Sequence, residues 1–265
     1  MLSKVLFIII FLFSLTSCNH NLNYKEEEPN FSSAEEAFNK AFDYIKIKDY
    51  HKANQTFEVL EKEFPFSTWA THGQLINAYL NYEQGIYGEA LANLERFLQL
   101  HPTHKHADYA LYLKGMIFYV QVNTSERDQK NSYEAKETFE NLIAQFPNSV
   151  YAKDAKFKID LVNDHLAGQQ MEIGRFYQSK NSLVAAVNRY NIVIEQYQNT
   201  IHVSEALYRL VEIYMTLGLK GEALKYASIL GHNYPHNPWY HRAYDLMTNT
   251  DKYYLKNNKW YKKLL

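Results

Sequence analysis

Three closely spaced histidines, His101, His104 and His106, are candidates for binding a metal ion, because imidazole is a common metal ligand. A structural metal site usually also requires cysteines or another histidine pair at fixed spacing, and this sequence does not supply them. His101-Pro102 also occupies a position that holds Phe-Pro or Tyr-Pro elsewhere in the chain. We therefore predict that these histidines belong to a turn and that the protein has no metal site.

Catalytic motifs are absent from the sequence. It contains no nucleophile elbow, no His-Glu-x-x-His motif and no Walker loop, and Cys18 is its only cysteine. We predict that the chain is not an enzyme. It should have no catalytic residues and no cofactor apart from a covalently attached lipid. An enzyme bound to the cell envelope is a distant alternative.

Cys18 lies where bacteria attach lipid to exported proteins. The apolar stretch over residues 5–15 is shorter than the roughly 20 residues of a membrane-spanning helix and is typical of a signal peptide. It ends in Leu15-Thr16-Ser17-Cys18, which fits the bacterial lipobox, in which small residues admit the peptidase and the thiol takes a diacylglyceryl group. We predict that residues 1–17 are a signal peptide and that Cys18 carries diacylglyceryl and N-acyl lipid, since one acyl chain alone anchors weakly. An ordinary signal peptide with a coincidental cysteine is the alternative.

The residues after Cys18 indicate the membrane to which the protein is sent and the segment that links the lipid to the fold. Asn19 follows Cys18, whereas an Asp at this position tends to retain lipoproteins in the inner membrane. Residues 18–33 are polar and suit a flexible link between lipid and fold. We expect a protein held by its lipid at the periplasmic face of the outer membrane.

The composition favours helices and argues against a nucleic-acid partner. Lys plus Arg (28) nearly balance Asp plus Glu (29), so no overall field attracts nucleic acid. The chain has 9 glycines and 6 prolines but 23 tyrosines and 15 phenylalanines. Scarce glycine favours long helices, and abundant aromatic side chains can fill the gaps between stacked helices.

A degenerate repeat organises the remaining sequence. An alanine is followed four positions later by another, mostly larger, apolar residue and then by a helix stop, usually an aromatic-Pro pair. The alanines are Ala53, Ala90, Ala135, Ala186 and Ala223. A second small residue precedes each of them, at Ala41, Ala78, Gly115, Gly174 and Val211. These spacings indicate helix–turn–helix units of about 34 residues, the tetratricopeptide (TPR) pattern. We predict an all-α, TPR-like solenoid of about five repeats with a C-terminal capping helix.

The predicted solenoid has two halves. Residues 34–152 should form an N-terminal half of three repeats, and residues 153–265 a C-terminal half of two repeats plus a capping tail. Residues 153–178 are predicted to form either one long helix or a helix pair between the halves. The polar insertion over residues 122–132 is expected to extend a helix or form a loop. Residues 251–265 combine lysines with aromatic residues, which suits a capping helix or contact with anionic lipid or an acidic partner.

Several segments exceed what a generic TPR pattern requires. They are residues 64–67 (FPFS), 101–104 (HPTH), 108–115 (DYALYLKG), 146–152 (FPNSVYA) and 184–189 (VAAVNR). With the lipobox, they make nearly the whole mature chain similar to the BamD family, TPR lipoproteins of the outer-membrane β-barrel assembly machinery. The resemblance implies a scaffold that helps receive unfolded outer-membrane proteins, together with other assembly lipoproteins.

The resemblance also implies a docking site for the POTRA domains of the barrel protein BamA in the C-terminal repeats. Arg189, in the Val-Asn-Arg motif, corresponds to a residue implicated in that contact, and a guanidinium suits a carboxylate partner. Glu172, Arg175 and Tyr177 could line the same surface. A solvated helix face is the alternative for these side chains.

The N-terminal repeats are implied to hold the substrate. Tyr44, Trp69, Tyr79 and Tyr82 are candidates to line a groove for an extended peptide, although packing between helices would explain each of them equally well. A different function remains open, in which the lipoprotein is a scaffold of a peptidoglycan-synthesis or secretion complex.

Overall fold

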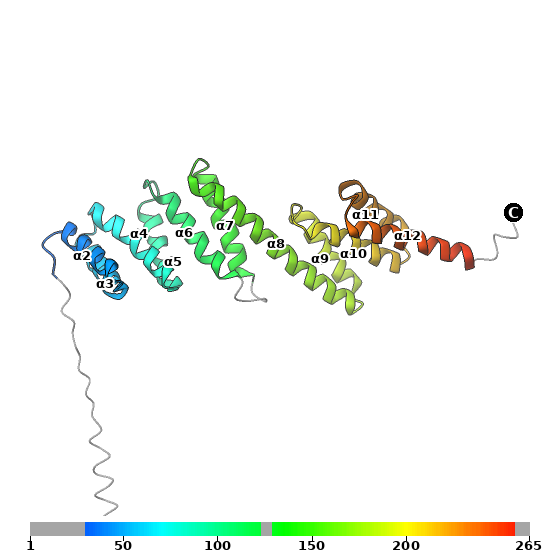
Figure 1. Cartoon of the computed structure of the whole chain (residues 1–265), viewed down its shortest axis with the longest axis horizontal. Coiled ribbons are helices and arrows are strands. Elements are labelled where there is room, and N and C mark those ends of the chain that lie inside the picture. The colour runs from blue at the N-terminus through cyan, green and yellow to red at the C-terminus, as the bar shows by residue number, and fades with distance from the viewer. Residues whose placement is uncertain (1–29, 123–128, 258–265) are drawn as a thin grey trace, which may run out of the picture.

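The computed structural model describes residues 30–122 and 129–257, with side chains described as far as residue 249. These ranges form eleven α-helices and no strand, stacked into an elongated rod (Figure 1). The helices are α2 (Ala34–Lys46), α3 (Tyr50–Glu63), α4 (Thr68–Glu83), α5 (Tyr87–Leu100), α6 (Ala107–Val120), α7 (Lys130–Gln145), α8 (Val150–Ser179), α9 (Leu183–Gln196), α10 (Val203–Thr216), α11 (Lys220–Asn233) and α12 (Pro238–Asn257). The predicted all-α, TPR-like solenoid is confirmed.

The helices pair along the chain as α2–α3, α4–α5, α6–α7, α8–α9 and α10–α11, and α12 closes the described part of the stack. Residues 153–178 lie in one long helix, because α8 continues for 30 residues. Along its length α8 packs against α7 and α9 in turn, so it joins the two predicted halves. In the described part of the chain, no helix has both the length and the apolar character needed to cross a bilayer.

The turn after the second helix of each pair follows a common rule. Phe64, His101, Phe146, Tyr197 and Tyr234 each follow the last helical residue, and each backbone N–H still bonds the carbonyl four residues earlier. Proline follows four of these five residues and cannot continue the helix. Ser67 and Ser149 then accept hydrogen bonds from the N–H groups of Trp69 and Tyr151 and so cap the next helix. The predicted stop signals therefore mark the real helix ends.

In four of the helix pairs, the turn between the two helices contains one residue with a left-handed backbone conformation. Gly85 and Gly218 each have a φ of 74°, and Lys48 and Asn181 hold the same conformation with φ of 61° and 59°. In each turn the next N–H bonds back to a carbonyl near the helix end, as Ile86 does to Asn81 at 2.8 Å. This is the usual hydrogen-bond pattern of a helix that ends in a left-handed residue.

The small residues of the repeat lie where paired helices cross. The five anchor alanines of the repeat are completely buried. A Cβ added to Gly115 would lie 2.5 Å from the ring of Phe139, and one added to Gly174 would lie 2.5 Å from the ring of Tyr190. Glycine therefore creates the space that each aromatic ring occupies.

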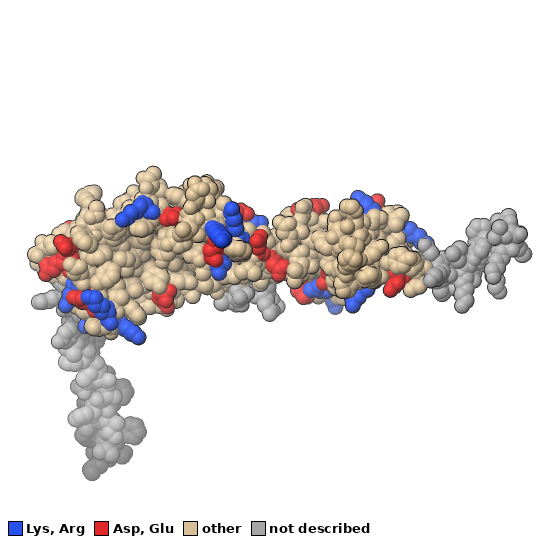
Figure 2. All heavy atoms as spheres, turned by 45° about the horizontal axis from the view of Figure 1, so that its top comes forward, with Lys and Arg blue, Asp and Glu red and all other residues tan. Residues whose placement is uncertain are grey.

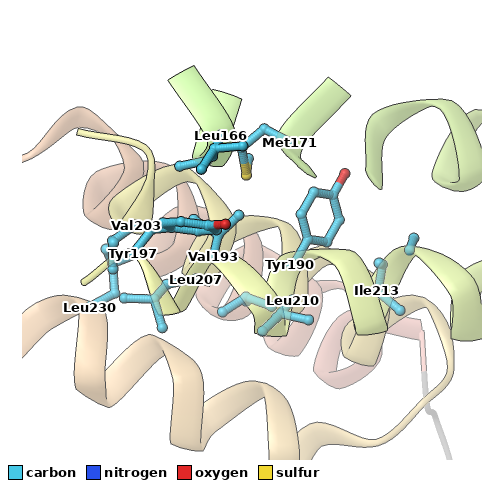
Figure 3. Packing of buried hydrophobic residues seen from close by; sticks show 14 of the residues in the cluster. Leu166, Met171, Tyr190, Val193, Tyr197, Val203, Leu207, Leu210, Ile213 and Leu230 are labelled. Carbon is cyan, nitrogen blue, oxygen red and sulfur yellow. The ribbon is translucent and has the colours of Figure 1, made fainter. Parts of the chain in front are cut away.

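The largest hydrophobic cluster extends from α7 through α8 to α12 and so lies mostly in the C-terminal half. Figure 3 shows Tyr190 and Tyr197 of α9 between Met171 of α8 and Leu207 of α10, in agreement with the burial of all four side chains. Two smaller clusters lie on α2, α3 and α4 and on α4, α5 and α6. The core is thus continued from one repeat to the next, as expected for a solenoid.

Parts of the sequence prediction fall outside the described residues. The signal peptide, Cys18 and most of the tether precede residue 30, and the insertion over residues 122–132 is described only at Val122 and from residue 129 onward. In the C-terminal tail, α12 reaches Asn257, but the side chains of residues 251–265 lie outside the described part.

The close contact between Gly174 and Tyr190 gives the first testable prediction. Gly174→Ala should lower the thermal unfolding midpoint, because the buried ring cannot yield and overpacking costs about 1–3 kcal/mol. Gly88→Ala is the matched control, since no atom lies within 4 Å of the added Cβ. This control should be neutral or slightly stabilising, because alanine favours a helix over glycine. Circular dichroism of the purified proteins measures both, and equal midpoints for the two variants would contradict the packing argument.

Candidate functional site

A groove of about 470 Å³ opens along the first helices of the N-terminal pairs. Its wall comes from four helices and the turn before α6, with lining residues Phe38, His72, Leu75, Ile76, Tyr79, Lys105, His106, Tyr109 and Tyr151. The volume falls in the range of ligand-binding pockets, and most of the wall is apolar or aromatic. The groove can therefore accept apolar side chains of a bound chain.

Aromatic pairs build this wall. The Tyr109 and Tyr151 rings lie 5.3 Å apart, and Phe38 packs 4.8 Å from the predicted residue Trp69. Tyr79 lines the groove, with the Tyr82 ring 6.5 Å away. Burial raises the pKa of Tyr109 to about 12, and the neighbouring Tyr79 adds to the effect. Tyr109 is thus a neutral hydroxyl at physiological pH.

The four predicted groove residues lie at different positions relative to the groove. Tyr79 lines the groove, Tyr82 lies beside it on α4, and the Trp69 ring packs against Phe38, which also lines the groove. Tyr44 instead packs beneath the ammonium groups of Lys40 and Lys52, at 5.1 and 5.9 Å from its ring centre.

Phe38, Tyr109 and Tyr151 also line the groove and were not among the predicted residues, although the sequence carries a signal for Tyr109 and Tyr151. Trp69, Tyr109 and Tyr151 each precede a buried alanine near the start of the first helix of a pair. Tyr109 and Tyr151 are therefore the repeat equivalents of Trp69, and this register would have identified them as aromatic residues of the same surface.

Histidines gather at one end of the groove. His72 of α4 lies 5.8 Å from His104 and 6.4 Å from His106, measured between ring centres. Burial lowers the pKa of His72 and of His104, and the nearby Lys105 and His106 contribute to both shifts. In the ranges that the structure describes, no three His, Cys, Asp or Glu side chains form a group that could hold a metal ion.

The C-terminal half holds a second hollow, of about 850 Å³, along α8. Glu172 and Arg175 line it and form an ion pair. Arg175 also donates to Glu205 of α10 at 2.9 Å, and Arg209 bonds the same carboxylate at 3.2 Å. This network joins α8 to α10 and leaves Arg175 only partly exposed.

Arg189 and Tyr177 lie on a different side of α8 from Glu172 and Arg175. Arg189 of α9 is half-buried and donates to Gln170 of α8 at 3.1 Å. Gln170 and Tyr177 are seven positions apart and share a helix face, whereas Glu172 and Arg175 point about 140–160° away from Gln170. Tyr177 also supports the turn, since its carbonyl accepts the N–H of Ser182 at 2.9 Å. The four predicted partner residues are thus split between two faces.

Charged residues of both signs are interspersed along the rod. Figure 2 shows no large area of one sign on the face that it displays. This distribution agrees with the formal net charge of −1 and indicates that recognition depends on local groups.

The partly buried histidines at the groove predict a loss of stability in acid. Because His72 and His104 have lowered pKa values in the folded protein, the unfolded chain binds more protons, and stability falls as pH drops below about 6.5. The thermal midpoint should fall between about pH 7.5 and about pH 5.5, and fall less in the variant His72→Asn/His104→Asn. The exposed His236→Asn is the control and should follow the wild type. An unchanged pH response of the double variant would refute this origin.

The shared carboxylate of Glu205 gives a second prediction for this region. Glu205→Gln should destabilise the protein by about 1–2 kcal/mol, because two partly buried arginines lose their charged acceptor. Glu95→Gln is the matched control, since Glu95 pairs with Lys114 but its side chain is 60% exposed. It should cost less than about 0.5 kcal/mol. Thermal unfolding compares the two variants, and a larger effect of Glu95→Gln would reverse the expected order.

Comparison with known proteins places the chain in a family. A family model named YfiO and described as an outer membrane lipoprotein matches residues 31–230. The "Outer membrane protein assembly factor BamD" of Rickettsia prowazekii is 44% identical over 212 residues, covering 80% of this chain and 84% of that protein. Its namesake from Caulobacter vibrioides is 37% identical, covering 84% of this chain and 72% of that protein.

Similar solved structures are more distant. The crystal structure of PilW, a type IV pilus biogenesis factor, is 14% identical and covers 80% of this chain and 99% of its own, with a TM-score of 0.36. A likeness at this level supports no conclusion about function. The match to the family model and the identities to its members show that the chain belongs to the BamD (YfiO) family of outer membrane lipoproteins.

Proposed function

We propose that this chain is an outer-membrane protein assembly factor that works as a non-enzymatic scaffold. The observation that carries the proposal is its similarity, over most of its length, to relatives named as assembly factors. The solenoid suits this role, because stacked helix pairs present long surfaces to other chains. This similarity favours barrel assembly over a peptidoglycan-synthesis or secretion scaffold.

The proposal divides the work between the two halves. The N-terminal groove receives extended segments of unfolded outer-membrane proteins, whose apolar side chains would contact Tyr79, Tyr109 and Tyr151. Alternate residues of an extended chain point to one side, so every second side chain could enter the groove. The C-terminal half binds the POTRA domains of a BamA-like barrel protein, and other assembly lipoproteins join the complex.

Lipid on Cys18 completes the proposed arrangement. A signal peptide over residues 1–17 is removed, and diacylglyceryl and N-acyl chains hold the protein at the periplasmic face of the outer membrane. The family description as an outer membrane lipoprotein supports this placement. Replacing Cys18 by Ser would test the anchor, since the variant should leave the membrane fraction.

Arg189 is the proposed contact residue in the C-terminal half. It is half-buried, and within the described ranges its one hydrogen bond is to the neutral Gln170, so its charge is available to a partner carboxylate. Glu172 and Arg175 form a second candidate contact, at the hollow along α8.

A detergent pull-down tests this assignment. The full-length lipoprotein should capture a POTRA-containing barrel protein, and Arg189→Glu should reduce capture at least about tenfold, as expected for a central interface arginine. Lys225→Glu is the matched control, because it makes the same charge change on an exposed residue of α11. Capture of no POTRA protein by the wild type would overturn the proposed complex, and equal losses in both variants would remove Arg189 from the interface.

A further inference from the structure

We propose that a small polar pocket between α8 and the α9–α10 turn binds a Ca²⁺ ion. The pocket has a volume of about 60 Å³ and is lined by Asp160 and Asn163 of α8 and by residues 196–200 at the end of α9 and in the turn. This volume suits an ion with a few water molecules and is far below the range of pockets for organic ligands. The bound ion would tie the middle of α8 to the end of α9.

The side chains of this pocket suit a hard cation. Asp160 supplies a carboxylate, and Asn163, Gln198 and Asn199 supply amide oxygens. Gln198 stands where the four other turns between helix pairs have proline, so this turn offers an additional amide. Ca²⁺ binds carboxylate, amide and backbone carbonyl oxygens in a flexible geometry. Such a site differs from the groups of His, Cys and acidic side chains that the described ranges lack.

Two of these side chains have oxygens without a partner. The Oδ1 atom of Asn163 is buried and accepts no hydrogen bond within the described ranges. Asp160 forms neither an ion pair nor a hydrogen bond with any described residue. By contrast, Asp154 of the same helix accepts from the hydroxyl of Tyr112 at 2.7 Å. A buried oxygen without a donor is destabilising, so a cation at this pocket would satisfy an unmet requirement of the fold.

The end of α9 adds negative potential. The last carbonyls of a helix have no partner inside it, and the helix dipole places partial negative charge there. α9 ends at Gln196, and its last turn contains no basic residue. The side-chain donors of the turn are already used, since Gln198 Nε2 donates to the carbonyl of Glu195 at 3.4 Å and Thr200 Oγ1 donates to that of Tyr197 at 2.8 Å. The oxygens of Gln198 and Thr200 therefore remain available as ligands.

No side chain of the chain itself supplies the positive charge. Among the described residues, no lysine, arginine or histidine lines the pocket. Lys136 of α7 lies 5.7 Å from the centre of the Tyr197 ring, but Glu140 lies 3.9 Å from its ammonium group. A site with one carboxylate and several neutral oxygens belongs to the weak class of Ca²⁺ sites, with a Kd of about 10⁻⁴–10⁻³ M. Mg²⁺ should bind less well, because it requires a strict octahedral geometry and loses water reluctantly.

Terbium luminescence tests the inference on the full-length protein in detergent. Tb³⁺ occupies Ca²⁺ sites and emits when a nearby excited tyrosine transfers energy to it, and Tyr197 lines this pocket. Tyrosine excitation of the wild type with Tb³⁺ should therefore produce emission, and Ca²⁺ should suppress it with an apparent Kd of about 10⁻⁴–10⁻³ M. Mg²⁺ should require higher concentrations. At ten times its Kd, Ca²⁺ should also raise the thermal unfolding midpoint by about 3–6 °C.

Three variants locate the site. Asp160→Asn removes the charge and keeps the size of the side chain, so it should weaken Ca²⁺ binding at least about tenfold and abolish the rise in midpoint. Asn163→Asp adds a second carboxylate and should tighten binding about tenfold or more, which loss of folding could not imitate. Asp245→Asn is the matched control, because it removes an exposed carboxylate of α12 outside the pocket, and it should bind Ca²⁺ like the wild type.

Three results would overturn the inference. If Ca²⁺ neither suppresses terbium emission nor raises the midpoint of the wild type, the pocket holds water only. If Asp160→Asn and Asp245→Asn both retain the affinity of the wild type, or Asn163→Asp does not tighten binding, the cation binds elsewhere. If Mg²⁺ competes as well as Ca²⁺, the assignment to Ca²⁺ is wrong.

Discussion

The close approach of paired helices at small residues is the constraint on which the rest of the structure depends. The anchor alanines are fully buried, and Gly115 and Gly174 leave room for the rings of Phe139 and Tyr190. A single helix pair cannot bury its apolar face alone, so each pair must pack against the next. The rod of Figure 1 follows from repeating this contact.

Under the same constraint, aromatic residues on the first and second helices of a pair have different surroundings. Phe57, Phe139 and Tyr190 lie on second helices and fill the core. Tyr79, Tyr109 and Tyr151 lie on first helices and line the groove. A groove rich in aromatic side chains thus arises from the architecture of the solenoid, and such side chains offer large contact areas at low entropic cost.

Charged side chains have different partners in the two halves of the chain. In the C-terminal half, Arg175 and Arg209 share Glu205, so most of their charge is used to hold α8 against α10. In the N-terminal groove, Lys105 has no such partner in the described ranges and its charge faces the groove.

The sequence by itself determined the repeat, the helix ends and the fold class, because small residues, large residues and stop signals recur at spacings set by helix geometry. Of the four residues that it suggested for a groove, Tyr79 lines the groove that the structure forms. Only the tertiary structure decided that residues 153–178 form one helix, since α8 is held by packing on α7 and then on α9. It also decided that Tyr109 meets Tyr151, that Arg175 reaches Glu205 thirty residues away, and that Arg189 and Glu172 lie on different faces. Helical periodicity assigns a residue to a face, but the rotation between successive repeats decides which faces meet.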